Sequence, residues 1–217
     1  MTRTLPRAVL FDWDNTLVDN WQVIADAMNA TLSAMGNPVW TLDETRSRIR
    51  ASLRDSFPRM FGDRWPEARE IYYRTFAARH LDQLEPMEGA ADLLHALRQR
   101  DVFLGVVSNK HGHYLRAEAD RLGWSSLFGA IVGAGDTERD KPASDPVIRA
   151  LEPSGIASGP AVWFVGDADV DMRGGVGSGC WPVLLRAEAP GPGEFSDCPP
   201  ALYRTGCNAL RQYLETL

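Results

Sequence analysis

Two aspartates, Asp12 and Asp14, follow directly after an apolar run at residues 8–11 and are the first candidates for chemistry. A turn at the end of a strand can present both side chains, so that one carboxylate attacks while the other moves a proton. If the target is a phosphate dianion, each unit-charge pair at about 4 Å costs about 4 kcal/mol at an effective dielectric constant near 20. Such an attack therefore requires nearby cations.

The two lysines of the chain are candidates for part of that positive charge. Of 23 basic residues, 21 are arginines, and the lysines are Lys110 and Lys141. An ammonium group is a compact point charge whereas a guanidinium is a broad planar fork, so a site that needs one small cation cannot always use arginine. Lys110 ends the tripeptide Ser108-Asn109-Lys110, and Lys141 precedes a proline.

A second acidic segment, Gly166-Asp167-Ala-Asp169-Val-Asp171, follows the apolar run at residues 161–165. Asp12, Asp167 and Asp171 would form the oxygen-rich ligand set that Mg²⁺ prefers, with water and substrate oxygens completing six ligands. The spacing leaves open which of Asp167 and Asp171 binds directly and whether Asp169 joins. We favour Asp167 as the direct ligand.

The elements that must position these segments follow an alternating pattern. Apolar runs of strand length alternate with helix-like patterns, which is typical of a parallel sheet covered on both faces. Polar clusters at the carboxyl ends of such strands meet at one edge of the sheet, where ligands bind. We therefore predict an α/β fold with a Rossmann-like parallel sheet. The expected strands lie at residues 8–11, 102–107, 130–132, 161–165 and 181–185, and the expected helices at residues 90–100, 114–122, 146–151 and 207–214.

The first two expected strands are separated by some 90 residues, far more than one crossover needs. The excess reads as helical, so we predict a core domain of residues 1–19 and 87–217 and an inserted α-helical domain of residues 20–86. Thr41-Leu-Asp-Glu44 has the spacing of a capping box and would begin one helix. Pro66 suits the first turn of another, which would run to about Leu81.

The predicted insertion is rich in arginine. If its first capped helix continued through residue 54, Arg46, Arg50 and Arg54 would lie on one face, where like charges at four-residue spacing repel. One interpretation is a solvated surface. The other is that Arg50 or Arg54 binds a carboxylate or second phosphate of a substrate, in which case substitution by alanine would lose about 1.5–3 kcal/mol of binding.

Composition excludes several other classes of protein. The formal net charge is −6, so we expect no nucleic-acid partner. No apolar run approaches the ~18 residues of a membrane span, and the first seven residues lack the apolar stretch of a secretory signal, so we expect a cytoplasmic protein without membrane contact. The three cysteines are odd in number and lack the Cys-x-x-Cys spacing, which predicts free thiols.

The four polar motifs together resemble the haloacid dehalogenase superfamily of phosphohydrolases over essentially the whole chain. They are Asp-x-Asp-x-Thr after the first strand, a serine after the second, a downstream lysine, and Gly-Asp-x-x-x-Asp after a later strand. The resemblance implies that Asp12 forms an aspartyl-phosphate with Mg²⁺ as cofactor, and that Lys141 supplies a second cation. Asp14 would exchange the proton and offer its backbone carbonyl to the metal. The remaining motif residues would hold the turn or the substrate: Thr16, Ser108, Asn109 and Lys110.

In this superfamily, an insertion after the first motif is a helical cap that closes over the site and contacts the rest of the substrate. Its position and the Ser-Asn-Lys tripeptide are most similar to phosphoglycolate phosphatases. The expected function is therefore hydrolysis of a small phosphorylated metabolite such as phosphoglycolate, by a monomer or homodimer. Two alternatives stay open: a β-phosphoglucomutase-like phosphotransferase, and a catalytically idle protein that binds phosphorylated ligands.

The sequence departs from the family pattern in three places. In Lys141-Pro-Ala-Ser-Asp-Pro, the second proline lies two residues later than in the usual Lys-Pro-x-Pro, which can shift the following helix but not the lysine. Asn15 stands where the family usually has glycine, and asparagine is the other residue that tolerates a positive φ. Glycines at 174, 175, 177 and 179 replace the usual alanines. Because glycine costs about 1 kcal/mol relative to alanine inside a helix, we expect a weak or interrupted helix there.

Overall fold

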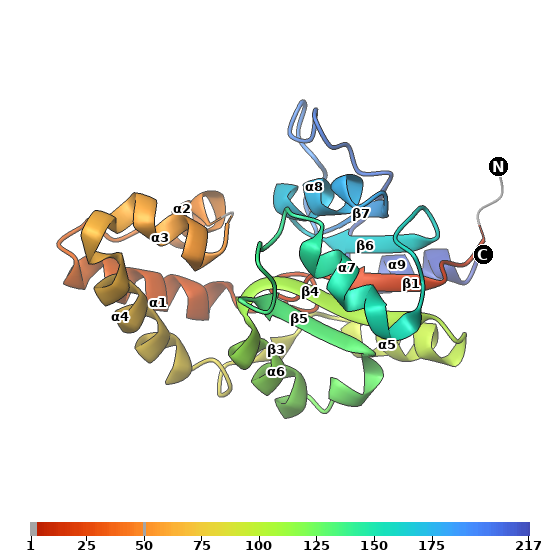
Figure 1. Ribbon diagram of the computed structural model, residues 1–217, viewed down its shortest axis with the longest axis horizontal. Coiled ribbons are helices and arrows are strands. Elements are labelled where there is room, and N and C mark those ends of the chain that lie inside the picture. The colour runs from red at the N-terminus through yellow and green to blue at the C-terminus, as the bar shows by residue number, and fades with distance from the viewer. Residues whose placement is uncertain (1–3, 50) are drawn as a thin grey trace.

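The computed structural model describes residues 4–49 and 51–217. Its main sheet has six parallel strands in the order β5-β4-β1-β6-β7-β8. The predicted parallel α/β architecture is confirmed (Figure 1). The strands are β1 (Ala8–Phe11), β4 (Phe103–His111), β5 (Ala130–Ala134), β6 (Val162–Gly166), β7 (Trp181–Leu185) and β8 (Leu202–Arg204).

Helices cover both faces of this sheet because alternate residues of each strand point to opposite sides. In β1, Val9 and Phe11 join one hydrophobic cluster while Ala8 and Leu10 join another. The helices on the first side are α5 (Ala90–Gln99), α6 (Gly112–Arg121) and α9 (Cys207–Leu214), and those on the second are α7 (Asp145–Leu151) and α8 (Asp169–Gly177). The strands are therefore buried on both faces, as continuous apolar runs require.

A short antiparallel pair, β2 (Val18–Asp19) with β3 (Glu85–Pro86), marks where the chain leaves the sheet and returns to it. Between these strands, α1 to α4 pack around their own apolar cluster, which includes Met28, Phe57 and Tyr72. Figure 1 shows these helices beside the sheet, beyond one end of its strands. They are α1 (Trp21–Ala34), α2 (Leu42–Arg48), α3 (Leu53–Phe61) and α4 (Trp65–Ala77).

Local signals in the sequence account for several of these boundaries. Thr41 caps α2 through the predicted capping box, its side chain accepting from the Glu44 amide at 3.1 Å. Pro66 lies in the first turn of α4. All three cysteines are free, as predicted, and buried. Within the described residues, no helix combines the length and the apolar character that crossing a bilayer needs.

The structure differs from the sequence analysis at three elements. The capped helix does not continue through residue 54: α2 ends at Arg48 and Ile49 has extended backbone, so Arg46 and Arg54 lie on different helices. The glycine-rich segment forms α8 without interruption, because Gly175 lets the helix pack closely on the sheet; an added Cβ would lie 3.2 Å from Phe164 Cβ. Strand β8 was not expected, since three half-buried residues leave little periodicity.

Candidate active site

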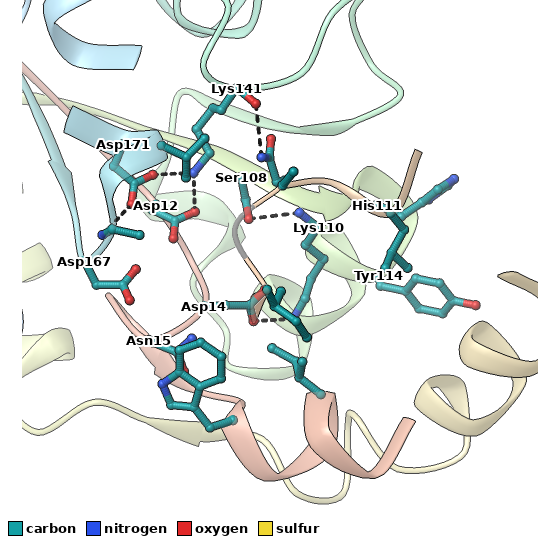
Figure 2. A pocket seen from close by; sticks show the side chains of 18 of the residues that line it. Asp12, Asp14, Asn15, Ser108, Lys110, His111, Tyr114, Lys141, Asp167 and Asp171 are labelled. Carbon is teal, nitrogen blue, oxygen red and sulfur yellow. Dashed lines mark hydrogen bonds and ion pairs between the residues drawn. The ribbon is translucent and has the colours of Figure 1, made fainter. Parts of the chain in front are cut away.

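The first and last acidic motifs meet because their strands are neighbours in the sheet. In register, Phe11 at the end of β1 pairs with Val106 of β4 and Val165 of β6. The backbone N–H of Asp12 donates to the Val165 carbonyl at 2.8 Å. Asp12 therefore lies beside Asp167, although 155 positions separate them along the chain, and Figure 2 shows both in the same pocket.

Lys141 lies between two of the carboxylates. Its Nζ donates to Asp12 Oδ1 at 2.6 Å and to Asp171 Oδ1 at 2.7 Å (Figure 2). The lysine is 2% exposed. Burial alone would lower the pKa of this ammonium, but the two carboxylates more than offset burial, and the pKa of Lys141 stands above its ordinary value. Lys141 is therefore a fixed positive charge at the predicted nucleophile.

A cluster of three carboxylates, from Asp12, Asp167 and Asp171, surrounds this point. One oxygen of each lies within 4.8 Å of the other two. Burial raises the pKa of Asp12 to about 7, with Asp171 adding to the rise and Lys141 opposing it. Burial also raises the pKa of Asp167, with further contributions from Asp171 and Asp12. Three carboxylates share one ammonium group, so the cluster suits a hard divalent cation such as Mg²⁺.

Asp169 lies in a different environment. Its Oδ2 forms an ion pair with Arg173 Nε at 2.9 Å, and its Oδ1 accepts a hydrogen bond from Cys198 Sγ at 3.4 Å. Of the three aspartates in the last motif, Asp167 and Asp171 belong to the cluster around Asp12. The structure thus brings Asp167 and Asp171 to Asp12, and their role as metal ligands stays a prediction.

The turn after Asp12 uses Asn15 as expected. Asn15 has φ of 63°, the left-handed conformation that asparagine tolerates. Its backbone N–H donates to the Val18 carbonyl at 2.6 Å, and the Leu17 N–H donates to the Trp13 carbonyl at 2.9 Å. Thr16 is buried within this turn, with its N–H donating to the Trp13 carbonyl at 3.3 Å. The turn holds Asp14 at the pocket wall.

Lys110 is held between two carboxylates of its own. Its Nζ donates to Asp14 Oδ1 at 2.7 Å and to Glu118 Oε2 at 2.6 Å. Burial opposes the charge of Lys110, but Asp14 and Glu118 raise its pKa above the ordinary value. Burial favours the neutral form of Glu118, but Lys110 and the hydrogen bonds of His80 and Trp13 bring its pKa below the ordinary value.

Sequence reasoning missed Glu118. The signal was present, because Glu118 lies between Leu115 and Ala119 on the face of α6 that packs on the sheet. A carboxylate on that face needs donors to offset burial.

The Ser-Asn part of the tripeptide also lines the pocket. Ser108 is 4% exposed, and its Oγ accepts from the Lys110 N–H at 3.2 Å. The Asn109 side chain donates through Nδ2 to the Lys141 carbonyl at 3.2 Å. This bond ties the end of β4 to the loop that carries Lys141.

The opposite wall of the pocket comes from the helical insertion and is mainly apolar. Sequence reasoning did not single out these residues, because aromatic residues at helical spacing also fill cores. They are Trp21, Ile24, Ile49, Ala51, Leu53, Tyr72, Tyr73 and Phe76.

The structure does not place Arg54 at the pocket, where the sequence analysis considered it as a substrate contact. Arg54 does not line the pocket; its guanidinium pairs with Asp140 at 3.0 Å. Arg50 lies outside the described residues. The segment between α2 and α3 does reach the pocket, through Ile49 and Ala51.

Comparison with known proteins agrees with the family resemblance of the four motifs. The family model of the haloacid dehalogenase-like hydrolases matches residues 9–184. A phosphoglycolate phosphatase of Aquifex aeolicus is 31% identical over 182 residues, covering 82% of this chain and 84% of that protein. This similarity supports the expected enzyme class, a phosphatase.

Two solved structures are similar over almost the full length. A hydrolase of this superfamily from Ehrlichia chaffeensis is 28% identical with a TM-score of 0.69, covering 100% of this chain and 99% of its own. A Clostridium acetobutylicum structure, described as a predicted phosphatase, has a TM-score of 0.86 at 21% identity, covering 99% and 100%, and shows the shared fold. The family match, the identity to the Aquifex protein and this fold agree with the motifs: the chain belongs to the haloacid dehalogenase-like hydrolases.

Proposed function

We propose that this protein is a Mg²⁺-dependent phosphatase that hydrolyses a small phosphorylated metabolite through an aspartyl-phosphate on Asp12. The observation that carries the proposal is the placement of Lys141 Nζ 2.6 Å from Asp12 Oδ1, within a cluster of three carboxylates. An ionised Asp12 repels a phosphate dianion by about 4 kcal/mol per charge pair at 4 Å and an effective dielectric constant near 20. The ammonium of Lys141 offsets part of that repulsion.

In the first half of the proposed reaction, Asp12 attacks the phosphorus atom and the bond from phosphorus to the ester oxygen breaks. Asp14 gives its proton to that oxygen as it leaves, which produces the free alcohol. Ser108 and the Asn109 amide hold the phosphoryl oxygens beside Asp12. Lys141 keeps a positive charge at the site where negative charge accumulates.

In the second half, Asp14 takes a proton from a water molecule, and that water attacks the same phosphorus atom. The bond between Asp12 and phosphorus breaks, inorganic phosphate forms, and Asp14 is again protonated for the next cycle. The two carboxylates thus have different roles set by their surroundings. Asp12 lies in the cluster of Lys141, and Asp14 in the cluster of Lys110.

The residues that would hold Mg²⁺ are Asp12, Asp167 and Asp171, with the backbone carbonyl of Asp14 as a further oxygen ligand. When bound, the ion would supply Lewis-acid neutralisation of a phosphoryl oxygen. The carboxylate oxygens lie within 4.8 Å of one another, and burial first and mutual repulsion second raise the pKa of Asp12 and Asp167. Both observations support this assignment, because a bound cation would offset the cost of burying these charges and the repulsion between them.

Phosphoglycolate is the first substrate to test, since the Aquifex relative bears that activity in its name. The apolar wall gives a reason to include other esters. Among the described lining residues the lysines are Lys110 and Lys141, each already between two carboxylates. Neither lysine is therefore a free partner for a carboxylate of the substrate, and the apolar wall would favour an apolar leaving group. Phosphate esters with an aliphatic or aromatic leaving group belong in the same panel for this reason.

The proposal is tested by measuring phosphate release from such a panel with Mg²⁺ and with a chelator. We expect turnover with Mg²⁺ and its loss with the chelator. A hexose phosphate belongs in the panel, because conversion to its isomer without phosphate release would instead identify a phosphotransferase. Binding of the esters with no turnover in Mg²⁺ would contradict the proposal and favour an idle binding protein.

A further inference from the structure

Glu118, on α6, is a fully buried carboxylate that none of the predicted chemistry uses. Four side chains donate to it. Trp13 Nε1, Lys110 Nζ and Asn20 Nδ2 contact its Oε2 at 2.7, 2.6 and 3.3 Å. His80 Nδ1 lies 2.9 Å from its Oε1. A carboxylate with this many partners is held in one orientation.

The four donors come from separate parts of the chain that meet at this point. Trp13 stands between the two aspartates of the first motif, and Lys110 is near the end of β4. Asn20 directly precedes α1, and His80 follows α4. Glu118 therefore joins both chain segments that connect the sheet with helices α1 to α4.

Two of the four donors reach Asp14 as well. Lys110 Nζ and Asn20 Nδ2 each contact Asp14 Oδ1 at 2.7 Å. Because both bind one oxygen, they fix the rotation of the Asp14 carboxylate and leave proton transfer to its Oδ2. Their own positions are fixed in turn by Glu118.

We propose that Glu118 is a positioning residue for Asp14, which acts through Lys110 and Asn20 and makes the aim of the Asp14 carboxylate depend on the segments at both ends of the helical insertion. The proposal rests on the proposed function, in which Asp14 protonates the leaving oxygen. A purely structural Glu118 would stabilise the fold without affecting proton transfer, so the test must separate these two effects.

The dependence of the rate on the leaving group separates an effect on proton transfer from an effect on the fold. An alkoxide must be protonated as it leaves, whereas p-nitrophenolate leaves well without a proton. The quantity to compare is kcat/KM, which reports steps up to the first irreversible one, for an alkyl phosphate turned over by the wild type and for p-nitrophenyl phosphate. Asp14→Asn sets the full effect, since general acid catalysis contributes roughly 10²- to 10⁴-fold.

For Glu118→Gln we expect kcat/KM for the alkyl phosphate to fall roughly 10- to 100-fold, the size of effect that a small misplacement of a catalytic group produces. The value for p-nitrophenyl phosphate should fall less than about 3-fold. Asn20→Ala removes one of the two links to Asp14, and its loss should be smaller but equally selective. It also serves as the second variant if Glu118→Gln does not fold.

Thr31→Val is the matched control for loss of a buried hydrogen bond, because Thr31 is buried in α1 and donates to the Ala27 carbonyl at 2.8 Å. It should not change the ratio between the substrates. If Glu118→Gln and Asn20→Ala lose kcat/KM equally on both substrates while Asp14→Asn loses it selectively, the role of Glu118 is overturned and the proposed function stands. Equal losses in Asp14→Asn, or no turnover by the wild type, would overturn the proposed function as well.

Discussion

Two buried lysine clusters lie side by side in this molecule and are built alike. In each, an ammonium group lies between an aspartate of the first motif and an acidic residue on a helix: Lys141 between Asp12 and Asp171, and Lys110 between Asp14 and Glu118. They differ in what surrounds them. The Lys141 cluster has a third carboxylate and a surplus of negative charge, whereas the Lys110 cluster has further donors from neutral side chains.

The difference suggests how one pocket can hold two kinds of carboxylate. A cluster with surplus negative charge is completed by a cation and, through it, by a phosphoryl group. In the other cluster, both oxygens of Glu118 receive protein donors, so this carboxylate needs no cation and holds Lys110 and Asn20 in place against Asp14. We therefore assign the nucleophile to the first cluster and the proton carrier to the second.

The largest effect should follow from removing the nucleophile. Asp12→Asn keeps the size of the side chain but removes its charge, so we expect phosphatase activity to fall roughly 10⁴-fold or more. The fold should remain, which circular dichroism and thermal unfolding would check. A folded Asp12→Asn protein with activity within about tenfold of the wild type would break the assignment of the two clusters.

Removing either lysine should destabilise the fold, since breaking a buried ion pair costs about 3–5 kcal/mol. The clusters should differ in rescue. Mg²⁺ should restore part of the loss in Lys141→Met, because a cation among Asp12, Asp167 and Asp171 replaces the missing charge. In Lys110→Met, which keeps these three carboxylates, Mg²⁺ should stabilise the fold only as much as it stabilises the wild type, so the deficit relative to the wild type should not shrink. Urea unfolding of the wild type and both variants, with and without Mg²⁺, measures this, and an equal shrinkage of both deficits would remove the distinction between the clusters.

A smaller effect is expected from the metal on the wild-type protein. A ligand at 100 times its dissociation constant stabilises by about 2.7 kcal/mol. For a chain of this length, that corresponds to a rise in Tm of roughly 5–10 °C. Asp167→Asn should reduce the rise and Glu118→Gln should retain it. A Tm that does not respond to Mg²⁺ in the wild type would contradict the proposed metal site.

The smallest effect concerns Arg54, which pairs with Asp140 away from the pocket lining. The arginine is partly exposed, and we expect Arg54→Ala to cost about 1 kcal/mol of stability. KM for phosphoglycolate should stay within about 2-fold of the wild type, well short of the loss expected of a charge-assisted substrate contact. A tenfold rise in KM would restore the earlier interpretation of this residue as a substrate contact.

Sequence reasoning reached the sheet and the Lys141 cluster because both depend on local patterns. Apolar runs show the strands, and polar residues directly after them, such as Asp12 and Asp167, must share an edge. Lys141 could be added because it is one of two lysines in the chain and matches the downstream lysine of the family motif. The Lys110 cluster could not be assembled in this way. Glu118 and His80 come from helical segments whose rotation and packing determine what each residue meets, and a single sequence does not give those angles.

The helical insertion illustrates the same limit. Its existence followed from the distance between strands, and Thr41 and Pro66 gave two helix starts. Helix α2 packs on α1 and α3 packs on α4, and a single sequence does not show such long-range contacts. Because α2 ends at Arg48, Arg46 and Arg54 do not share one helix, and Ile49 and Ala51 line the pocket. Its treatment as a separate domain stays a prediction.

The central claim is that a phosphoryl group passes from substrate to the carboxylate of Asp12. The most direct measurement is to quench the enzyme with acid during turnover, reduce acyl phosphates with borohydride, and sequence the peptides by mass spectrometry. An aspartyl-phosphate at this position would be reduced to homoserine there, only in the presence of substrate. Unchanged aspartate at position 12, in samples where homoserine appears at another acidic residue, would contradict the account.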